Sequence, residues 1–118
     1  MERIEYDWPG HFIGAKDCKF FRTTHVNGWR VSTVGEYRPR GCEEGPPEHI
    51  GLDRYYETMV FPLADAVCSC GCGAHEVRSW SNEDFDAYQT ESGAAAGHEA
   101  MVRRYAKITP TPEGQGDE

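Results

Sequence analysis

Two runs of alternating apolar and polar residues, 18–26 and 29–37, lie on either side of Asn27-Gly28. Asn-Gly between such runs is the strongest short-range signal for a β-hairpin, because a type I′ turn needs positive φ at both central residues. A two-residue turn also sets the register. The facing pairs on the more apolar side are then Val26 with Trp29, Thr24 with Val31, Arg22 with Thr33, Phe20 with Gly35 and Cys18 with Tyr37. We expect this side of the hairpin to face the core.

Residues 53–63 form another alternating segment and predict a further strand. One face carries Tyr55, Glu57, Met59 and Phe61, and the other carries Arg54, Tyr56, Thr58 and Val60. We expect the first face to pack, which would bury Glu57, and a buried carboxylate needs a cation or several hydrogen-bond donors. Arg22 is the expected partner, because it points with the apolar side of the hairpin. It is either an edge arginine whose stem packs while its head reaches water, or a guanidinium aimed into a pocket.

Apolar residues at helical spacing predict a helix over residues 94–107. Its stripe consists of Ala94, His98, Met101, Val102 and Tyr105. A histidine on such a stripe is typical of a hydrogen-bonded core residue, and we expect this of His98. Glu99 and Arg103 are expected to form an i,i+4 pair on the outer side of the helix.

The remaining segments carry weaker signals. A short helix is predicted after Ser81, which would cap it, with Phe85 and Tyr88 as its anchors. Gly and Pro punctuate much of the rest of the chain. Three further segments are predicted, namely a turn at residues 8–10, a strand at 11–15 and a loop at 38–52.

Together these elements predict an α+β fold, in which a small antiparallel sheet with a central β-hairpin packs against a C-terminal helix. The length of 118 residues is that of one domain. We assign residues 1–108 to this domain. Residues 109–118 form an acidic tail that contains Gly and Pro, and we expect it to be disordered.

The formal net charge of −8 comes from dispersed acidic residues. A nucleic-acid-binding surface needs clustered Lys and Arg, and the sequence has no such cluster, so direct nucleic-acid binding is not expected. The acidic charge favours solubility, or alternatively a surface that meets a basic partner protein. No apolar run approaches the length of a membrane span. With no secretory signal and an odd number of cysteines, we expect a cytoplasmic location with reduced thiols.

Three of the five cysteines lie within five positions, and a histidine follows them. Thiolate and imidazole are ligands that zinc prefers, and Cys72-x-x-His75 has the spacing of a zinc knuckle. The predicted zinc ligands are Cys68, Cys70, Cys72 and His75, with Cys42 as a further candidate. The alternative is a glycine-rich loop whose small thiols fill space and stay reduced. Zinc is thus the one cofactor that the sequence suggests.

Motifs that would fix a reaction are absent from the sequence. It lacks a P-loop, a dinucleotide fingerprint, a Gly-x-Ser-x-Gly elbow, a His-Glu-x-x-His segment and the paired segments of zinc deaminases. A catalytic cysteine would need an activating base, and nothing in the sequence brings a histidine to a particular thiol. The sequence therefore favours a protein that is not an enzyme. The alternative is a small zinc- or thiol-dependent enzyme built on residues 68–75.

Polar and aromatic residues gather on the hairpin and on the strand at residues 53–63. If the two are neighbours, these side chains converge near one end of the sheet. Such a mixture of donors, acceptors and rings suits a small polar ligand or a protein contact, and equally an ordinary sheet surface. The candidate binding residues are Arg22, Glu36, Tyr37, Arg38, Arg54, Tyr56, Glu57 and Thr58.

Six sequence blocks span almost everything between Trp8 and Ala106. They are Trp-Pro-Gly-His-Phe-Ile at 8–13, Val-Ser-Thr-Val-Gly-Glu-Tyr-Arg-Pro at 31–39, Arg-Tyr-Tyr-Glu-Thr-Met-Val-Phe at 54–61, Cys-Gly-Cys-Gly at 70–73, Asp-Ala-Tyr-Gln-Thr at 86–90 and Gly-His-Glu-Ala-Met-Val-Arg-Arg-Tyr-Ala at 97–106. With these blocks the chain resembles a family of short, uncharacterised proteins of bacteriophages and prophages. In that family the last block more often ends in Lys-Trp than in Arg104-Tyr105.

The resemblance implies a single domain and a small accessory protein made in an infected or lysogenic bacterial cell, where it would be cytoplasmic. It carries over no catalytic residue. Phage proteins of this size often counter host defences, so by analogy we expect a non-catalytic accessory binding protein. It would inhibit a host defence protein or sequester a small anionic signal such as a nucleotide. The expected partner is therefore a host protein or a small anionic ligand, and a homo-oligomer is not excluded.

Overall fold

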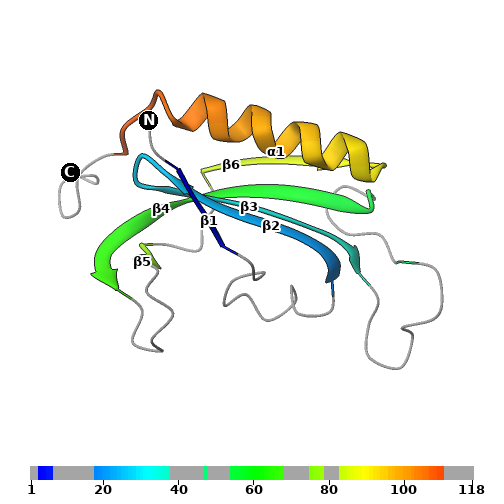
Figure 1. Ribbon diagram of the computed structural model, residues 1–118, viewed down its shortest axis with the longest axis horizontal. Coiled ribbons are helices and arrows are strands. Elements are labelled where there is room, and N and C mark those ends of the chain that lie inside the picture. The colour runs from blue at the N-terminus through cyan, green and yellow to red at the C-terminus, as the bar shows by residue number, and fades with distance from the viewer. Residues whose placement is uncertain are drawn as a thin grey trace.

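The computed structural model describes residues 3–6, 18–37, 47, 54–67, 75–78 and 83–110. Within them one helix lies against one face of an antiparallel sheet (Figure 1). The strands are β1 (Arg3–Tyr6), β2 (Cys18–Val26), β3 (Trp29–Tyr37), β4 (Tyr56–Val67), β5 (His75–Val77) and β6 (Asp84–Tyr88). The helix is α1 (Glu91–Tyr105). The predicted α+β fold, with a central hairpin packed against a C-terminal helix, is confirmed.

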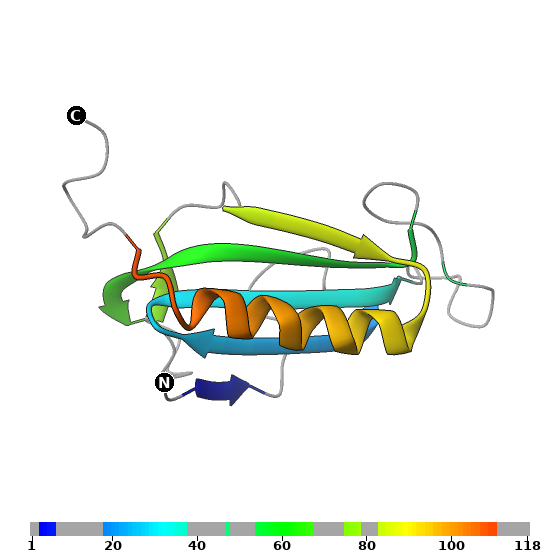
Figure 2. The ribbon, with the colours of Figure 1, turned by 90° about the horizontal axis from the view of Figure 1, so that it is seen from above.

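The sheet has the strand order β1-β2-β3-β4-β5, and β6 also pairs with β4. Besides β3, two strands pair with β4, each at a different part of its length. Its first residues, 56–60, pair with β6, whereas Leu63 and Val67 pair with β5. Figure 1 shows the end of β4 curling away from the helix, with β5 beside it. Figure 2, seen from above, shows α1 lying over the middle of the sheet and β1 at one edge.

The hairpin turn forms at Asn27 and Gly28, with φ angles of 52° and 84°. The register predicted for the five facing pairs is confirmed. The turn also meets the end of α1, because Nδ2 of Asn27 donates to the carbonyl oxygens of Tyr105 (3.2 Å), Ala106 (3.3 Å) and Ile108 (2.9 Å). Carbonyl groups at a helix C-terminus lack partners within the helix. The asparagine that makes the turn therefore also caps the helix.

The helix α1 starts three residues earlier than predicted, at Glu91. Its N-cap is Thr90, whose Oγ1 accepts a hydrogen bond from the backbone N–H of Gly93 at 3.0 Å. All five residues of the predicted stripe are buried, so that part of the prediction is confirmed. The predicted pair of Glu99 with Arg103 is wrong, because Glu99 binds arginines of β1 and β2 instead.

The core lies between α1 and the side of the hairpin that was expected to face it. Its members are Val26, Trp29, Val31, Val60, Met101, Val102 and Tyr105. The rings of Trp29 and Tyr105 meet edge to face with their centroids 4.9 Å apart. The indole N–H of Trp29 donates to the carbonyl oxygen of Ile108 at 2.6 Å, so the ring packs with its polar atom satisfied.

The strand β4 starts three residues later than predicted and ends four residues later. Tyr56, Thr58 and Val60 are buried, and Val60 belongs to the core. On the face that was expected to pack, Phe61 is buried but Glu57 is only partly buried, and the core under α1 is built on the other face. The β3–β4 register is the reason, because it places Thr58 across from Thr33, on the side that α1 covers. The period of two fits either face, so alternation alone cannot choose between them.

Residues 84–88 form the strand β6, and the predicted short helix is wrong. In β6, Phe85 lies across from Met59 and Tyr88 across from Tyr56. The edge of β4 offers unpaired backbone groups, and pairing with them outweighs a local preference for helix. Ser81, the predicted N-cap, lies outside the described residues.

A second, smaller cluster packs on the face away from α1. Cys18 and Val34 are buried there, against Phe21 and Tyr37. The prediction that Cys18 and Tyr37 share the helix-facing side is therefore wrong. The alternation is interrupted at Glu36, which has a φ of 52°. Positive φ at a residue other than glycine redirects the strand and the side chains beside it.

Other predictions concern parts of the chain that the structure does not describe. The turn at 8–10 and the strand at 11–15 lie outside the described residues, as does the loop at 38–52 apart from Pro47. The same holds for the tail beyond residue 110. Among the described residues, no helix is long and apolar enough to cross a membrane.

Candidate ligand-binding cleft

The pairing of β3 with β4 makes several predicted binding residues neighbours in the sheet. The Tyr56 hydroxyl donates to Oε2 of Glu36 at 3.0 Å. Thr58 is fully buried, with its Oγ1 2.6 Å from that of Thr33. Glu57 lies on the opposite face, where desolvation raises the pKa of its carboxyl group. These residues are adjacent, as predicted, but they divide between the two faces of the sheet.

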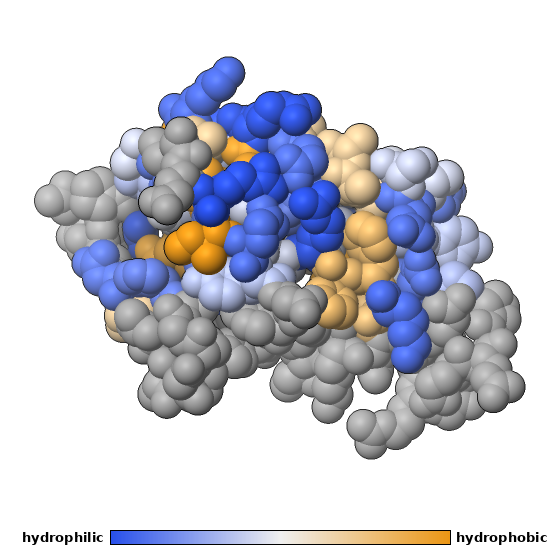
Figure 3. Space-filling model, in the orientation of Figure 1, coloured by the Kyte–Doolittle hydropathy of each residue, from blue (hydrophilic) through white to orange (hydrophobic). Residues whose placement is uncertain are grey.

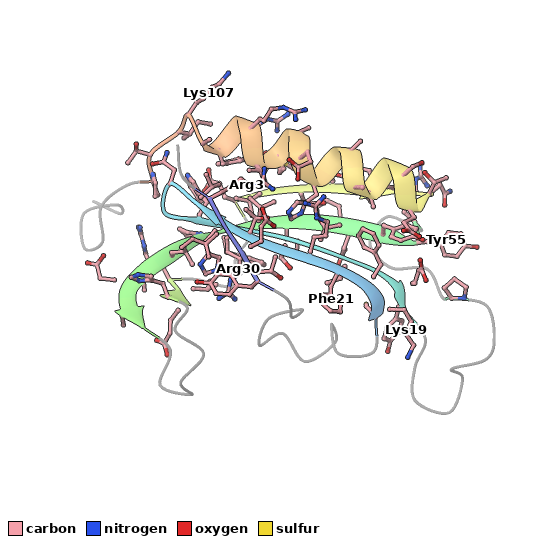
Figure 4. All side chains as sticks on the ribbon, viewed as in Figure 1. Arg3, Lys19, Phe21, Arg30, Tyr55 and Lys107 are labelled. Carbon is pink, nitrogen blue, oxygen red and sulfur yellow. The ribbon has the colours of Figure 1, made fainter. Side chains whose placement is uncertain are left out.

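Arg22 points toward α1 and binds a carboxylate there. Its Nη2 donates to Oε2 of Glu99 at 2.8 Å, and Arg3 holds the same carboxylate through two hydrogen bonds of 2.8 Å. Figure 4 shows the labelled Arg3 close to the helix. The hydrogen bond from Arg3, followed by the charges of both arginines, lowers the pKa of Glu99 to about 2. The predicted pairing of Arg22 with Glu57 is therefore wrong, and Arg22 joins the sheet to α1.

The other predicted binding residues are dispersed. Tyr37 packs against the cluster of Cys18 and Val34, away from the helix. Arg54 is exposed just before β4, and Arg38 lies outside the described residues. The described members of the predicted set therefore do not share one face of the sheet.

A cleft of about 280 Å³ opens elsewhere, beside the hairpin turn. Its walls come from β1, the end of β2, the curled end of β4 and β5. The lining residues are Ile4, Tyr6, His25, Val26, Asn27, Gly28, Leu63, Ala64, Asp65 and His75. Ile4 pairs with His25 across the β1–β2 ladder, and both lie on the face opposite to Thr24, which points toward α1. On the face drawn in Figure 3, the coloured residues are mostly hydrophilic, with a few hydrophobic residues among them.

A buried arginine contacts two residues of the cleft lining, His25 and His75. Arg30 is only 3% exposed and lies across from His25 in the hairpin. Its Nε–H donates to Nε2 of His25 at 3.0 Å, and its Nη2 donates to the backbone carbonyl of His75 at 3.2 Å. Figure 4 shows the labelled Arg30 on the side of the sheet away from α1. The guanidinium thus ties β3 to β2 and to β5 at the same point.

The state of His25 follows from these contacts. Because its Nε2 accepts from Arg30, the ring proton of the neutral imidazole is on Nδ1. Desolvation, and next the charge of Arg30, lower the pKa of His25 to about 4. At neutral pH the cleft therefore presents His25 as an uncharged ring. It lies 4.7 Å from the ring of Tyr6, centroid to centroid, at a tilt of 58°.

His75 is the one predicted zinc ligand within the described residues, and it is exposed at the cleft. Its Nδ1 lies 2.9 Å from the carbonyl oxygen of Ala64. The predicted ligands that lie outside the described residues are Cys42, Cys68, Cys70 and Cys72. Cys18, the one cysteine within the described residues, is buried.

Sequence reasoning did not select the residues that line this cleft. The hairpin register, which the sequence predicts, already sets His25 across from Arg30. This pairing of a histidine ring with a cation could have indicated a site on that face of the hairpin. No local pattern could bring Ile4 and Tyr6 beside Leu63, because these residues come from strands almost sixty positions apart in the chain.

A second polar cluster lies under α1, centred on His98, which is 0% exposed. The Thr24 hydroxyl donates to Oε1 of Glu5 at 2.7 Å, so it accepts from Nε2–H of His98 at 2.8 Å. Nδ1 of His98 then accepts from Thr33 at 2.7 Å, and Thr33 accepts from Thr58 at 2.6 Å. The prediction that His98 is a hydrogen-bonded core residue is confirmed. This cluster holds the helix on the sheet.

Comparison of the chain with protein-family models, with curated proteins and with solved structures found no match.

Proposed function

We propose that this chain is a non-catalytic accessory binding protein of phage type, and that it holds the ring of a small anionic ligand of the nucleotide class in the cleft. The observation that carries this proposal is the cleft itself, where the uncharged ring of His25 and the ring of Tyr6 lie between apolar walls. Aromatic rings beside apolar side chains suit a flat heterocycle.

The size of the cleft supports a ligand of this class. Ligand pockets measure about 300–1,000 Å³, so a cleft of about 280 Å³ matches a base or nucleoside better than a larger molecule. Ile4 and Leu63 supply apolar walls, and Asp65 and His75 supply polar groups at the exposed part of the lining. A ring would occupy the apolar part, and the charged part of the ligand would lie outside it.

The chemistry of His25 supports binding without catalysis. A general base needs an available lone pair and a pKa near the working pH. The Nε2 lone pair of His25 already accepts from Arg30, and its pKa of about 4 makes it a weak base at neutral pH. The histidine is therefore suited to shape the wall of a binding site.

The biological setting of this proposal rests on the resemblance to phage proteins. In the cytoplasm of an infected or lysogenic bacterium, a protein that holds a nucleotide signal would lower the free concentration of that signal. Host defence would then be countered by sequestration. The competing hypothesis is that a host defence protein is the direct partner.

The test is titration of the full chain with a panel of mono-, di- and cyclic nucleotides, followed by calorimetry and by NMR chemical shifts. Binding should shift the amides of β1 and of the end of β4. Tyr6→Ala and Ile4→Ala each remove part of the cleft wall and should weaken binding about tenfold, which corresponds to 1.4 kcal/mol. Arg103→Ala, on the exposed side of α1, is the control and should bind like the wild type.

The sign of the ligand charge can be tested separately. Asp65 lies in the lining, and a carboxylate repels an anion. Asp65→Asn should therefore tighten the binding of an anionic nucleotide and leave a neutral nucleoside unchanged. Phosphorus NMR of the same samples should show the nucleotide intact.

Two results would overturn the proposal. The first is the absence of any shift at the cleft with every nucleotide in the panel. The second is turnover of a bound nucleotide. Binding of a basic host protein that weakens steeply with salt would instead support the competing hypothesis.

A further inference from the structure

Among the described residues that line the cleft, His25 is the one polar side chain that is buried, with 5% of its area exposed. Asp65 and His75 are exposed, Tyr6 is half-buried, and the side-chain amide nitrogen of Asn27 donates to the end of the helix. A hydrogen bond is stronger where water is excluded, so a polar group in the buried part of a site fixes the orientation of a ligand. His25 is therefore the group that decides how a ring lies in the cleft.

The two ring nitrogens of His25 have different roles. Nε2 accepts from Nε–H of Arg30 at 3.0 Å, so the proton of the neutral ring is on Nδ1. Within the described part of the chain Nδ1–H has no acceptor, and yet Nδ1 is not one of the side-chain atoms that are buried without a partner. It therefore keeps an area that water or a ligand can reach. Because the ring lines the cleft, Nδ1–H is a donor that the cleft offers to its ligand.

The ring of His25 is held in this orientation before any ligand arrives. Arg30, which is 3% exposed, is itself fixed by a second hydrogen bond, from Nη2 to the carbonyl oxygen of His75 at 3.2 Å. The ring also meets that of Tyr6, with the centroids 4.7 Å apart. A donor that is already in place loses little conformational freedom on binding, so Nδ1–H is preorganised for an acceptor.

The edge of a base that meets His25 follows from the placement of the charged part of the ligand. The sugar and phosphate lie outside the apolar part of the cleft, so the edge farthest from the sugar enters first. In hypoxanthine, guanine and uracil this edge carries a keto oxygen, which is an acceptor, whereas in adenine and cytosine it carries an amino group, which is a donor. An amino group opposite Nδ1–H would leave two N–H groups facing each other. A buried donor without an acceptor weakens binding.

We infer that Nδ1–H of His25 donates to the keto oxygen of the bound base, and that the cleft takes keto bases in preference to adenine and cytosine. The inference rests on the proposed function, because it names the class of base that the same cleft takes. It makes His25 the residue that determines specificity. A site that hydrogen-bonds a group of its ligand rejects an analogue without that group more strongly than an apolar pocket does.

The test compares two matched pairs of uncharged nucleosides, inosine with adenosine and uridine with cytidine, by calorimetry on the full chain. Within each pair an amino group replaces the keto oxygen on a ring of nearly the same shape. Leaving a buried donor unpaired lowers affinity by roughly 5- to 150-fold. Because the cleft is open to solvent at one part of its lining, we expect a preference of at least about fivefold for the keto member of each pair. The corresponding monophosphates should show the same preference.

The wild type provides a second readout that needs no substitution. NMR spectra of the chain with ¹⁵N-labelled histidine report which ring nitrogen of His25 carries the proton. In the inosine complex the Nδ1–H proton should become observable and shift downfield, because the hydrogen bond to the keto oxygen slows its exchange with water. Adenosine should not produce this signal.

The variant His25→Glu replaces the donor by an acceptor. One carboxylate oxygen can accept from Arg30, which keeps the buried cation paired and the carboxyl group ionised, and the other offers a lone pair to the cleft. The preference should then reverse, so that adenosine and cytidine bind more tightly than inosine and uridine. The matched control is His75→Gln, which also replaces a histidine of the lining, but one whose Nδ1 is already bonded to the carbonyl oxygen of Ala64. This control should keep the wild-type preference.

Three outcomes would overturn this inference and leave the proposed function standing, because in each of them the cleft still binds nucleosides. They are the absence of a keto preference in both pairs, an unchanged Nδ1–H signal of His25 with inosine bound, and the wild-type preference in a folded His25→Glu variant. If that variant does not fold, the first two measurements decide. If no nucleoside or nucleotide shifts the amides of the cleft, the proposed function fails and this inference fails with it.

Discussion

The replacement of Thr33 by valine tests the hydrogen-bond network under the helix. Thr33, Thr58 and His98 are each 0% exposed, and the Thr33 hydroxyl donates to Nδ1 of His98. Valine has nearly the same shape, so the change removes one hydroxyl and opens little space. Nδ1 of His98 would then be buried without a donor. The Thr58 hydroxyl would lose its acceptor in Thr33 but keep its hydrogen bond with Tyr88.

The magnitude follows from these two losses. A buried polar group without a partner costs about 1–3 kcal/mol. Nδ1 of His98 loses its only donor and has this full cost, whereas Thr58 loses one of its two hydrogen bonds and has part of it. We expect Thr33→Val to lower the free energy of unfolding by about 2–4 kcal/mol. That is a large share of the roughly 5–15 kcal/mol of a typical domain. Urea unfolding followed by tryptophan fluorescence measures it, with the m-value unchanged.

Thr58→Val is the matched control, because it makes the same chemical change at an equally buried site. In this variant Thr33 still donates to His98 and loses only a donor to its own oxygen. Tyr88 also loses its hydrogen bond with Thr58, but it is partly exposed and can bond to water instead. Thr58→Val should therefore cost clearly less than Thr33→Val. A cost below about 0.5 kcal/mol for Thr33→Val, or the reverse order of the two variants, would refute the assigned proton directions.

Three further predictions concern acid, salt and packing. His98 has a pKa lowered to about 4 by desolvation, against about 6.5 when unfolded, so the unfolded chain binds more protons between these values. The free energy of unfolding should therefore fall by up to about 3 kcal/mol as the pH drops from 6.5 to 4. The difference in this free energy between the wild type and His98→Gln should shrink over the same range, and a constant difference would contradict the prediction. Glu99→Gln should lower the free energy of unfolding by about 1 kcal/mol at low salt and should expose the β1 amides around Arg3 to hydrogen exchange. Both effects should be smaller in 1 M salt, and equal losses at low and high salt would show that the ion pairs are not the cause. Gly35→Ala should cost about 1–3 kcal/mol in urea unfolding, because a Cβ would overlap the buried ring of Tyr56, and unchanged stability would show that the ring can move.

Local patterns carried the successful predictions. The hairpin depends on Asn27 and Gly28 adopting positive φ and on alternation in its two arms, all within twenty consecutive residues. The helix stripe likewise depends on spacing along one element. In both cases the physical cause lies between residues that are close in the chain, so the sequence contains it directly.

Predictions that needed the position of another element were wrong. Glu99 was assigned to Arg103 on its own helix, but it binds Arg3, which is 96 positions away in the chain. Residues 84–88 carry side chains that suit a helix start, but the free edge of β4 makes them a strand. Both predictions used only residues that are close in the chain. The structure was decided by an element that is distant in the chain but close in space.

Three features of this protein can be read from its sequence: a hairpin with its register, a helix with its buried stripe, and a cluster of thiols close to His75 in the chain. The tertiary structure alone decided which face of β4 packs, which cation meets Glu99, and that β1 and the curled end of β4 enclose a cleft with His25. The physical reason is that periodicity reports contacts within one element. A sheet face, an ion pair between elements and a cleft are set by contacts between strands that the chain order does not relate.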